Sequence, residues 1–86
     1  MLELGQVVAT PGVLDAVPGD YVLNALNRHA SGDWGVVCEE DRKQNDYAAE
    51  NAERIHSAYL APDGTKFWII TEWDRSYTTV LLPEEY

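Results

Sequence analysis

The sequence has a single cysteine, Cys38, and no long hydrophobic run. One thiol excludes an intramolecular disulfide and a cysteine-rich zinc site. The first residues lack a basic stretch followed by an apolar segment of about 7–15 residues, which is the mark of a signal peptide. The longest uncharged apolar runs, such as 67–70, are far too short to span a bilayer. We therefore expect a cytoplasmic protein with no metal, cofactor or membrane partner.

Basic residues are also scarce, because six Lys and Arg stand against fifteen Asp and Glu and give a net charge of −9. Such a chain should repel nucleic acid. The excess is uneven: residues 31–63 carry eight acids and three bases, and so contribute −5 of the −9. Two interpretations stay open, namely charge that keeps the protein soluble and an acidic surface that meets a basic partner.

Apolar residues make up 45% of the 86, which is enough for a folded core and too many for a disordered segment. A chain of this length buries only about 60–65% of the surface that its unfolded form exposes. We expect one core, and hence a single domain over residues 1–86.

Hydrophobic periodicity predicts an α+β fold. Helical spacing covers 12–17, where Thr10 and Pro11 suit the N-cap and first position, then 21–30, and then about 39–52. Strand alternation covers 2–8, 55–60, 65–73 and 77–82. The short connections near the C-terminus predict an antiparallel sheet of three to four strands, a C-terminal meander plus the N-terminal strand, with two or three helices packed on one face. Pro83 and the two glutamates after it are expected to protect a sheet edge.

The sequence also allows predictions for several single residues. Trp34, in a Gly-rich turn, should fill the core, and Asn45 on the third helix should hydrogen-bond to backbone. His29 at a helix end is interpreted as structural. Asp74 and Arg75 should form an ion pair within a turn.

Four carboxylates on the third predicted helix form the most function-like pattern. At 100° per residue they fall within about 60° of arc, along a stripe of about 21 Å. This predicted acidic stripe consists of Glu39, Asp46, Glu50 and Glu53. Further acidic candidates for the same surface are Asp33, Glu40, Asp63, Glu84 and Glu85. Arg42 and Lys43 lie three or four positions from two of the stripe residues, so a self-paired, solvated face is the alternative interpretation of this part of the stripe.

No motif indicates an enzyme. His29 and His56 lack the spacing of a zinc site, no Gly-rich phosphate loop follows a strand, and neither Ser57 nor Ser76 has the context of a nucleophile. We expect no catalytic residues.

The strings VVATPGVL, RHASGDWG, EEDRKQND and SAYLAPDGTKFWIITEWDRSYTTVLLPEEY resemble a family of small bacterial proteins of unassigned function, labelled plasmid-related proteins. The resemblance covers nearly the whole chain. It implies a mobile-element context and no particular chemistry.

Two functional hypotheses follow from these patterns. In the first, the acidic stripe imitates nucleic acid and occupies the basic surface of a host DNA-binding or defence complex, such as a CRISPR or restriction complex. In the second, the chain is a soluble housekeeping or toxin–antitoxin-like partner module, in which a sheet edge or an apolar patch binds and the charge only solubilises. A continuous acidic ridge would favour the first hypothesis, and scattered acids the second.

Overall fold

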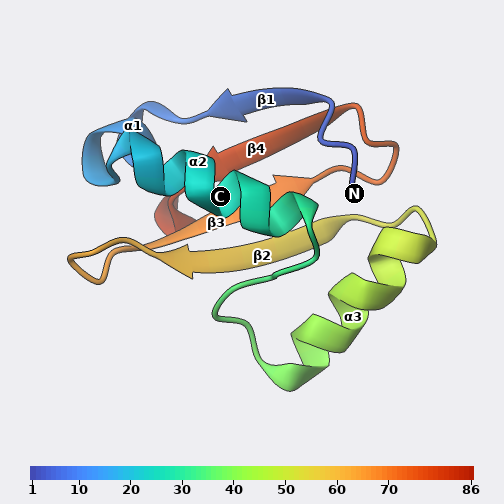
Figure 1. Cartoon of the computed structure of the whole chain (residues 1–86). Helices are drawn as coiled ribbons and strands as arrows, with labels where there is room; N and C mark the ends of the chain where they lie inside the picture. The colour runs from blue at the N-terminus through green and yellow to red at the C-terminus, as the bar shows by residue number, and fades with distance from the viewer.

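The computed structural model describes all 86 residues and has the predicted α+β fold (Figure 1). Four strands form one sheet and three α-helices accompany it. In chain order the elements are β1 (Gln6–Ala9), α1 (Pro11–Ala16), α2 (Gly19–Ala30), α3 (Glu39–Glu50), β2 (Ile55–Leu60), β3 (Lys66–Thr71), β4 (Tyr77–Leu81) and a 3-10 turn, η1 (Pro83–Glu85). None of the three helices has the length and apolar character needed to cross a membrane.

The sheet is mixed, with strand order β1-β4-β3-β2. The predicted meander of β2, β3 and β4 is confirmed, since both of its pairings are antiparallel. β1, however, pairs parallel to β4, because the long connection through three helices and the β2–β3 hairpin returns the chain in the same direction. β4 is therefore an interior strand. The prediction that Pro83 protects a sheet edge is wrong; the carboxylate of Glu85 instead accepts hydrogen bonds from the Thr10 hydroxyl at 2.5 Å and the Leu82 N–H at 2.8 Å.

α1 and α2 cover one face of the sheet, and α3 lies beside β2 (Figure 1). Thr10 caps α1 as predicted, because its hydroxyl accepts from the Val13 N–H at 3.3 Å. α2 buries one face, which carries Val22, Ala25, Leu26 and His29. His29 is buried, whereas Leu23 is 65% exposed.

The main core lies between α1, α2 and the sheet. It is built from residues that alternate along the strands, including Tyr59, Phe67, Ile69 and Val80, and from the helix residues Val13, Val17, Val22, Ala25 and Leu26. A smaller cluster of Trp34, Ala48 and Ile55 joins α3 to the sheet. The prediction that Trp34 fills the core is confirmed, since only 4% of it is exposed.

Candidate functional site

The predicted acidic stripe is shorter in the structure than its helical spacing suggested. α3 ends at Glu50, and Ala52 has a φ of 53°, which turns the chain out of the helix. Glu53 therefore lies beyond the helix. Only Glu39, Asp46 and Glu50 remain on α3.

Two of these three carboxylates are already paired within the chain. Arg42 forms ion pairs with Glu39 and, at 3.3 Å, with Asp46. Asp46 also accepts a hydrogen bond from the Trp34 indole N–H at 2.8 Å. Glu53 accepts one from the Gln44 amide at 3.2 Å, whereas Glu50 has no partner. The first half of the stripe is thus a self-paired surface, with bonds typical of exposed helix pairs.

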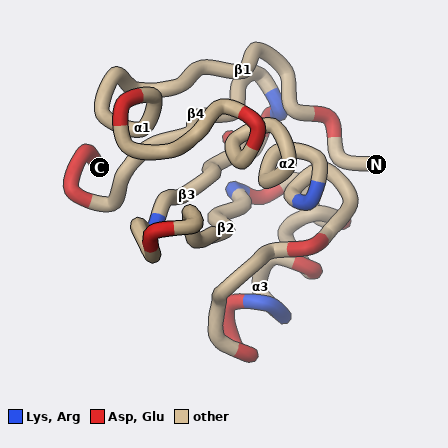
Figure 2. The backbone as a smooth tube through the Cα atoms, turned by 60° about the vertical axis from the view of Figure 1, so that its left-hand side comes forward, with Lys and Arg blue, Asp and Glu red and all other residues tan.

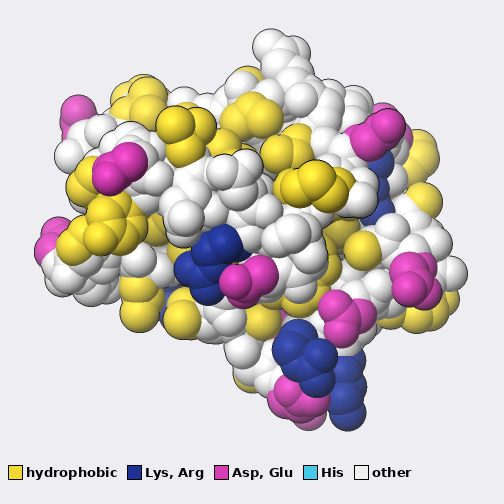
Figure 3. All heavy atoms as spheres, in the orientation of Figure 1, with side chains coloured by type: hydrophobic (Ala, Val, Ile, Leu, Met, Phe, Trp, Pro, Cys, Tyr) yellow, Lys and Arg dark blue, Asp and Glu magenta, His cyan; other side chains and the backbone are white.

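The other acidic candidates are dispersed. Asp33 pairs with Arg28 at 2.8 Å, and Asp63 accepts the Thr65 N–H at 3.0 Å in the β2–β3 turn. Glu40 and Glu84 are exposed. Figure 2 shows acidic residues along α1, α2, α3, the β2–β3 turn and the C-terminal residues, and Figure 3 shows them as separate spots on the face that carries α1 and α2. Acids spread in this way do not form one ridge.

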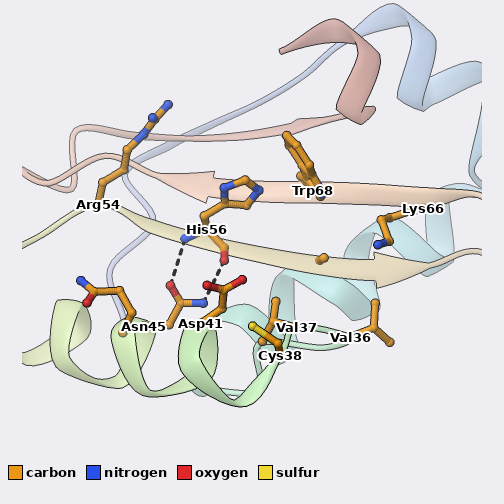
Figure 4. Close-up of a pocket in the computed structure, with 11 residues that line it drawn as sticks. Val36, Val37, Cys38, Asp41, Asn45, Arg54, His56, Lys66 and Trp68 are labelled. Atoms are coloured by element: carbon orange, nitrogen blue, oxygen red, sulfur yellow. Dashed lines mark hydrogen bonds between the residues drawn. The ribbon is translucent and has the colours of Figure 1, made fainter.

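A pocket of about 410 Å³ lies on the other side of α3, against the face of the sheet that α1 and α2 leave open (Figure 4). We call it the α3–sheet pocket. Eleven residues line it: Val36, Val37, Cys38, Asp41, Gln44, Asn45, Arg54, His56, Ala58, Lys66 and Trp68. Its volume falls within the range of sites that hold a side chain or a small ligand.

Asn45 fixes the wall that α3 contributes to this pocket. Its amide donates to the His56 carbonyl at 2.8 Å and its side-chain oxygen accepts from the His56 N–H at 3.3 Å (Figure 4). The predicted bond from Asn45 to backbone is therefore confirmed. The two bonds occupy the backbone N–H and C=O of His56, which face away from the sheet, as a neighbouring strand would.

A second wall comes from the chain before α3, which lies against β2 through Gly35. Gly35 forms a parallel bridge with Ala58, and a Cβ at this position would lie 1.9 Å from the Ala58 carbonyl oxygen. Its φ of 76° also favours glycine. The Val36 N–H donates to that carbonyl at 2.8 Å. Glycine here is what allows Val36 and Val37 to stand at the mouth of the pocket.

Aromatic side chains form the part of the pocket that lies on the sheet. The His56 ring contacts Trp68 edge-on, with 4.3 Å between ring centroids, and Tyr86 from the C-terminus lies 5.8 Å from the Trp68 ring. Arg54 sits over the Tyr86 ring and forms an ion pair with Glu72 at 3.4 Å. Burial, with a smaller contribution from the Arg54 guanidinium, lowers the pKa of His56 and so favours its neutral imidazole.

Two charges in the pocket have no partner. Asp41 projects from α3 toward β2 and Lys66 stands on the sheet, and neither takes part in an ion pair (Figure 4). The pocket therefore offers one free anion and one free cation beside the apolar surfaces of Val37 and Trp68. No cluster of three or more His, Cys, Asp or Glu side chains is placed to hold a metal ion.

His29 is fully buried and belongs to a chain of hydrogen bonds. The Thr78 hydroxyl donates its one proton to the Leu4 carbonyl at 2.7 Å, so it accepts from the Thr71 hydroxyl at 2.8 Å. The Thr71 hydroxyl in turn accepts from the Nε2–H of His29 at 2.8 Å. Nδ1 of His29 then accepts from the Ser57 hydroxyl at 2.5 Å. Burial, together with the Arg75 charge, lowers the pKa of His29 to about 4. All four side chains are fully buried, so this Ser–His pair is a structural element, as the sequence indicated.

Arg75 does not form the predicted ion pair with Asp74. Its guanidinium donates to the carbonyls of Glu53 at 2.6 Å, Ala48 at 2.9 Å and Glu72 at 3.1 Å, and so caps the C-terminal end of α3. Asp74 accepts instead from the Ser76 hydroxyl at 2.7 Å. The three carbonyl oxygens lie within reach of the long Arg75 side chain, and Asp74 already has a partner in Ser76.

The sequence did not identify the α3–sheet pocket. Strand alternation did place Lys66 and Trp68 on the same face of β3, which was a partial signal. The pocket also needs Asp41 and the 36–38 segment, which lie more than 20 residues earlier in the chain and meet the sheet only after folding.

No protein family, no curated protein and no solved structure matches this chain.

Proposed function

We propose that this chain is a small interaction protein that binds a segment of a partner protein in the α3–sheet pocket. The observation that carries the proposal is the pair of unpartnered charges, Asp41 and Lys66, beside an apolar and aromatic surface in a pocket of about 410 Å³. Pockets that combine apolar surface with convergent polar groups are where proteins bind ligands.

The lining defines the chemistry of the partner. Arg54 is engaged with Glu72, and the lowered pKa of His56 favours its neutral form, so the charges of Asp41 and Lys66 cancel. The partner segment should therefore carry one apolar side chain, to lie against Trp68, flanked by an acidic group for Lys66 and a basic group for Asp41. Most of the remaining acidic surface then serves solubility, which agrees with its dispersed distribution.

A charge swap tests the proposal without changing the net charge. Asp41→Lys combined with Lys66→Glu keeps the chain at −9, because one acid and one base exchange places. Peptides selected for binding to the natural chain from a random-sequence display library should lose most of their affinity for the swapped protein. Peptides that bind both proteins equally would refute the pocket as the binding site. Circular dichroism and a melting curve confirm that the swapped protein is folded.

A second candidate function is the acidic-stripe hypothesis, and one observation favours it. Asp46 and Glu50 line a shallow hollow of about 540 Å³ together with Leu2 and Trp34. Carboxylates beside apolar residues suit the head and stem of a Lys or Arg side chain. In this version the chain, carried by a mobile element, binds the basic surface of a nucleic-acid-handling complex of its host.

Salt separates the two candidates. Binding through the stripe would weaken steeply as rising salt shortens the screening length below about 10 Å. Binding in the α3–sheet pocket, where apolar contact contributes, would change much less. A partner whose affinity falls by orders of magnitude over that range would favour the stripe.

A further inference from the structure

We propose that two copies of this chain pair along the open edge of β1, antiparallel, to form one continuous sheet of eight strands. The inference begins with the contrast between the two edges of the sheet. On the β2 edge, the Asn45 amide occupies the backbone of His56, and the Trp34 carbonyl and Val36 N–H occupy that of Ala58 at 3.2 and 2.8 Å. The chain has closed that edge with its own atoms.

The β1 edge has no such cover. The Gln6 N–H donates to the Ser76 carbonyl at 3.1 Å and the Thr10 N–H to the Val80 carbonyl at 3.0 Å, so the even-numbered residues face β4. The N–H and C=O groups of Val7 and Ala9 consequently point away from the sheet. Val7 is 45% exposed and Val8 is 40% exposed. The strand is short, but no lysine, proline or bulge lies within it to block pairing with another chain.

The occupant that fits this edge is a second copy, because the free groups are symmetric about Val8. In the antiparallel arrangement Val7 lies opposite Ala9 of the other copy and Ala9 opposite its Val7. Each of these two pairs exchanges two backbone hydrogen bonds, so four bonds form and no free group of the strand is left over. The two Val8 side chains meet across the axis as a close cross-strand pair.

Neither neighbouring register pairs all of the free backbone groups. Shifting one way places Ala9 opposite Gly5, whose φ of 63° takes it out of the extended conformation. Shifting the other way places Val7 opposite Pro11, which has no N–H to donate. The register centred on Val8 is the one that uses every free group.

The distribution of charge also favours contact between two copies at β1 over contact elsewhere on the surface. Two copies at −9 each repel over most of their surfaces, but residues 4–14 carry no charged side chain. The paired strands, Gln6–Ala9 of each copy, therefore bring no like charges opposite each other. The edge of β1 is where two such acidic molecules can approach.

The assembly stops at two copies, because the other edge of each sheet is closed at His56 and Ala58. A two-fold contact of this kind closes on itself and does not grow into a fibre. Strands of four residues form an interface smaller than that of a stable complex, so the dimer should be weak and depend on concentration.

Sedimentation equilibrium of the whole chain tests the proposal. The weight-average mass should rise from 9.7 kDa toward twice that value as the concentration increases from low to high micromolar. Val7→Pro removes an outward N–H but no bond to β4, and proline is tolerated at such edge positions; this variant should stay at 9.7 kDa throughout. Val7→Ala keeps the N–H and should associate within about threefold of the natural chain, because the backbone bonds carry the pairing.

A natural chain that stays monomeric at every concentration overturns the proposal, and so does a Val7→Pro variant that dimerises like the natural chain. If Val7→Pro fails to fold, amide hydrogen exchange on the natural chain decides the question. The Val7 and Ala9 amides should exchange fast in dilute solution and become protected as concentration rises, while the Val8 amide is protected at both. Exchange of Val7 and Ala9 that does not change with concentration overturns the proposal.

Discussion

His29 should make the folded state sensitive to acid, because it is buried in its neutral form. Its pKa is lowered to about 4 by burial and by Arg75, whereas the unfolded chain has a pKa of 6.5 at this position. Between pH 6.5 and pH 4 His29 binds a proton in the unfolded state but not in the folded state. The stability contributed by the neutral imidazole is therefore complete above pH 6.5, falls as pH drops from 6.5 to 4, and changes no further below 4.

The magnitude follows from the two pKa values. A difference of about 2.5 units corresponds to about 3 kcal/mol over the whole window, of which about 2 kcal/mol is already lost at pH 5. This is a large share of the stability of a domain this small. The hydrogen bonds of His29 to Ser57 and Thr71 give both nitrogens of the neutral imidazole a partner.

Urea unfolding at pH 8 and pH 5 measures this loss. Other groups also titrate, so the comparison is with His29→Gln, which keeps a polar side chain at the site but binds no proton. The variant should be less stable at pH 8 and should lose about 2 kcal/mol less than the natural chain between the two pH values. His56→Gln shows how much of the loss comes from the other histidine, whose pKa is also lowered but which lies on the open face of the sheet outside this network. An equal pH dependence in the natural chain and in His29→Gln would refute the interpretation of His29 as a buried neutral base.

Three further predictions concern stability and are measured by the same unfolding curves. Phe67→Ala should cost about 3–5 kcal/mol, because the ring is buried between the sheet and α2; a loss within 1 kcal/mol would mean that the core lies elsewhere. Asn45→Ala should cost about 2–3 kcal/mol, since it leaves backbone groups of β2 without partners, whereas Asn51→Ala, on the exposed end of the same helix, should cost well under 1 kcal/mol; equal losses would contradict this. Arg75→Ala should cost about 1–3 kcal/mol because three carbonyls lose their donor; an unchanged midpoint would show that water replaces the guanidinium.

The meander was predictable from sequence because its information is local. Alternation in 55–60, 65–73 and 77–82, with turn residues between, determines both the strands and their antiparallel pairing. The inward direction of Trp34 and the backbone bond of Asn45 also followed from residue type and helical spacing. These features depend on residues close together in the chain.

Features that depend on distant residues were not predictable in the same way. The parallel pairing of β1 with β4 joins residues about 70 positions apart, and no local pattern states it. The end of α3 depends on Ala52 in a left-handed conformation, which Arg75 supports from the β3–β4 turn through the Glu53 carbonyl. The α3–sheet pocket likewise brings together three separate segments of the chain.

One capture experiment tests the central proposal most directly, and it compares three altered proteins with the natural chain. The first is the swap at Asp41 and Lys66. The second is the stripe variant with Glu50→Lys, Glu53→Lys and Asp46→Asn; asparagine keeps the acceptor for Trp34, and the net charge becomes −4. The third, Glu3→Lys, Asp15→Lys and Asp20→Asn, is a control with the same net charge of −4.

Each protein is immobilised, exposed to an extract of cells that naturally contain the chain, and the affinity of the captured partner is then measured with purified components. The proposal predicts that the swap at Asp41 and Lys66 loses the partner while the stripe variant and the charge control retain it. A partner that binds the swapped protein with unchanged affinity, and is lost only from the stripe variant, would contradict the α3–sheet pocket and place the binding surface on the acidic side of α3.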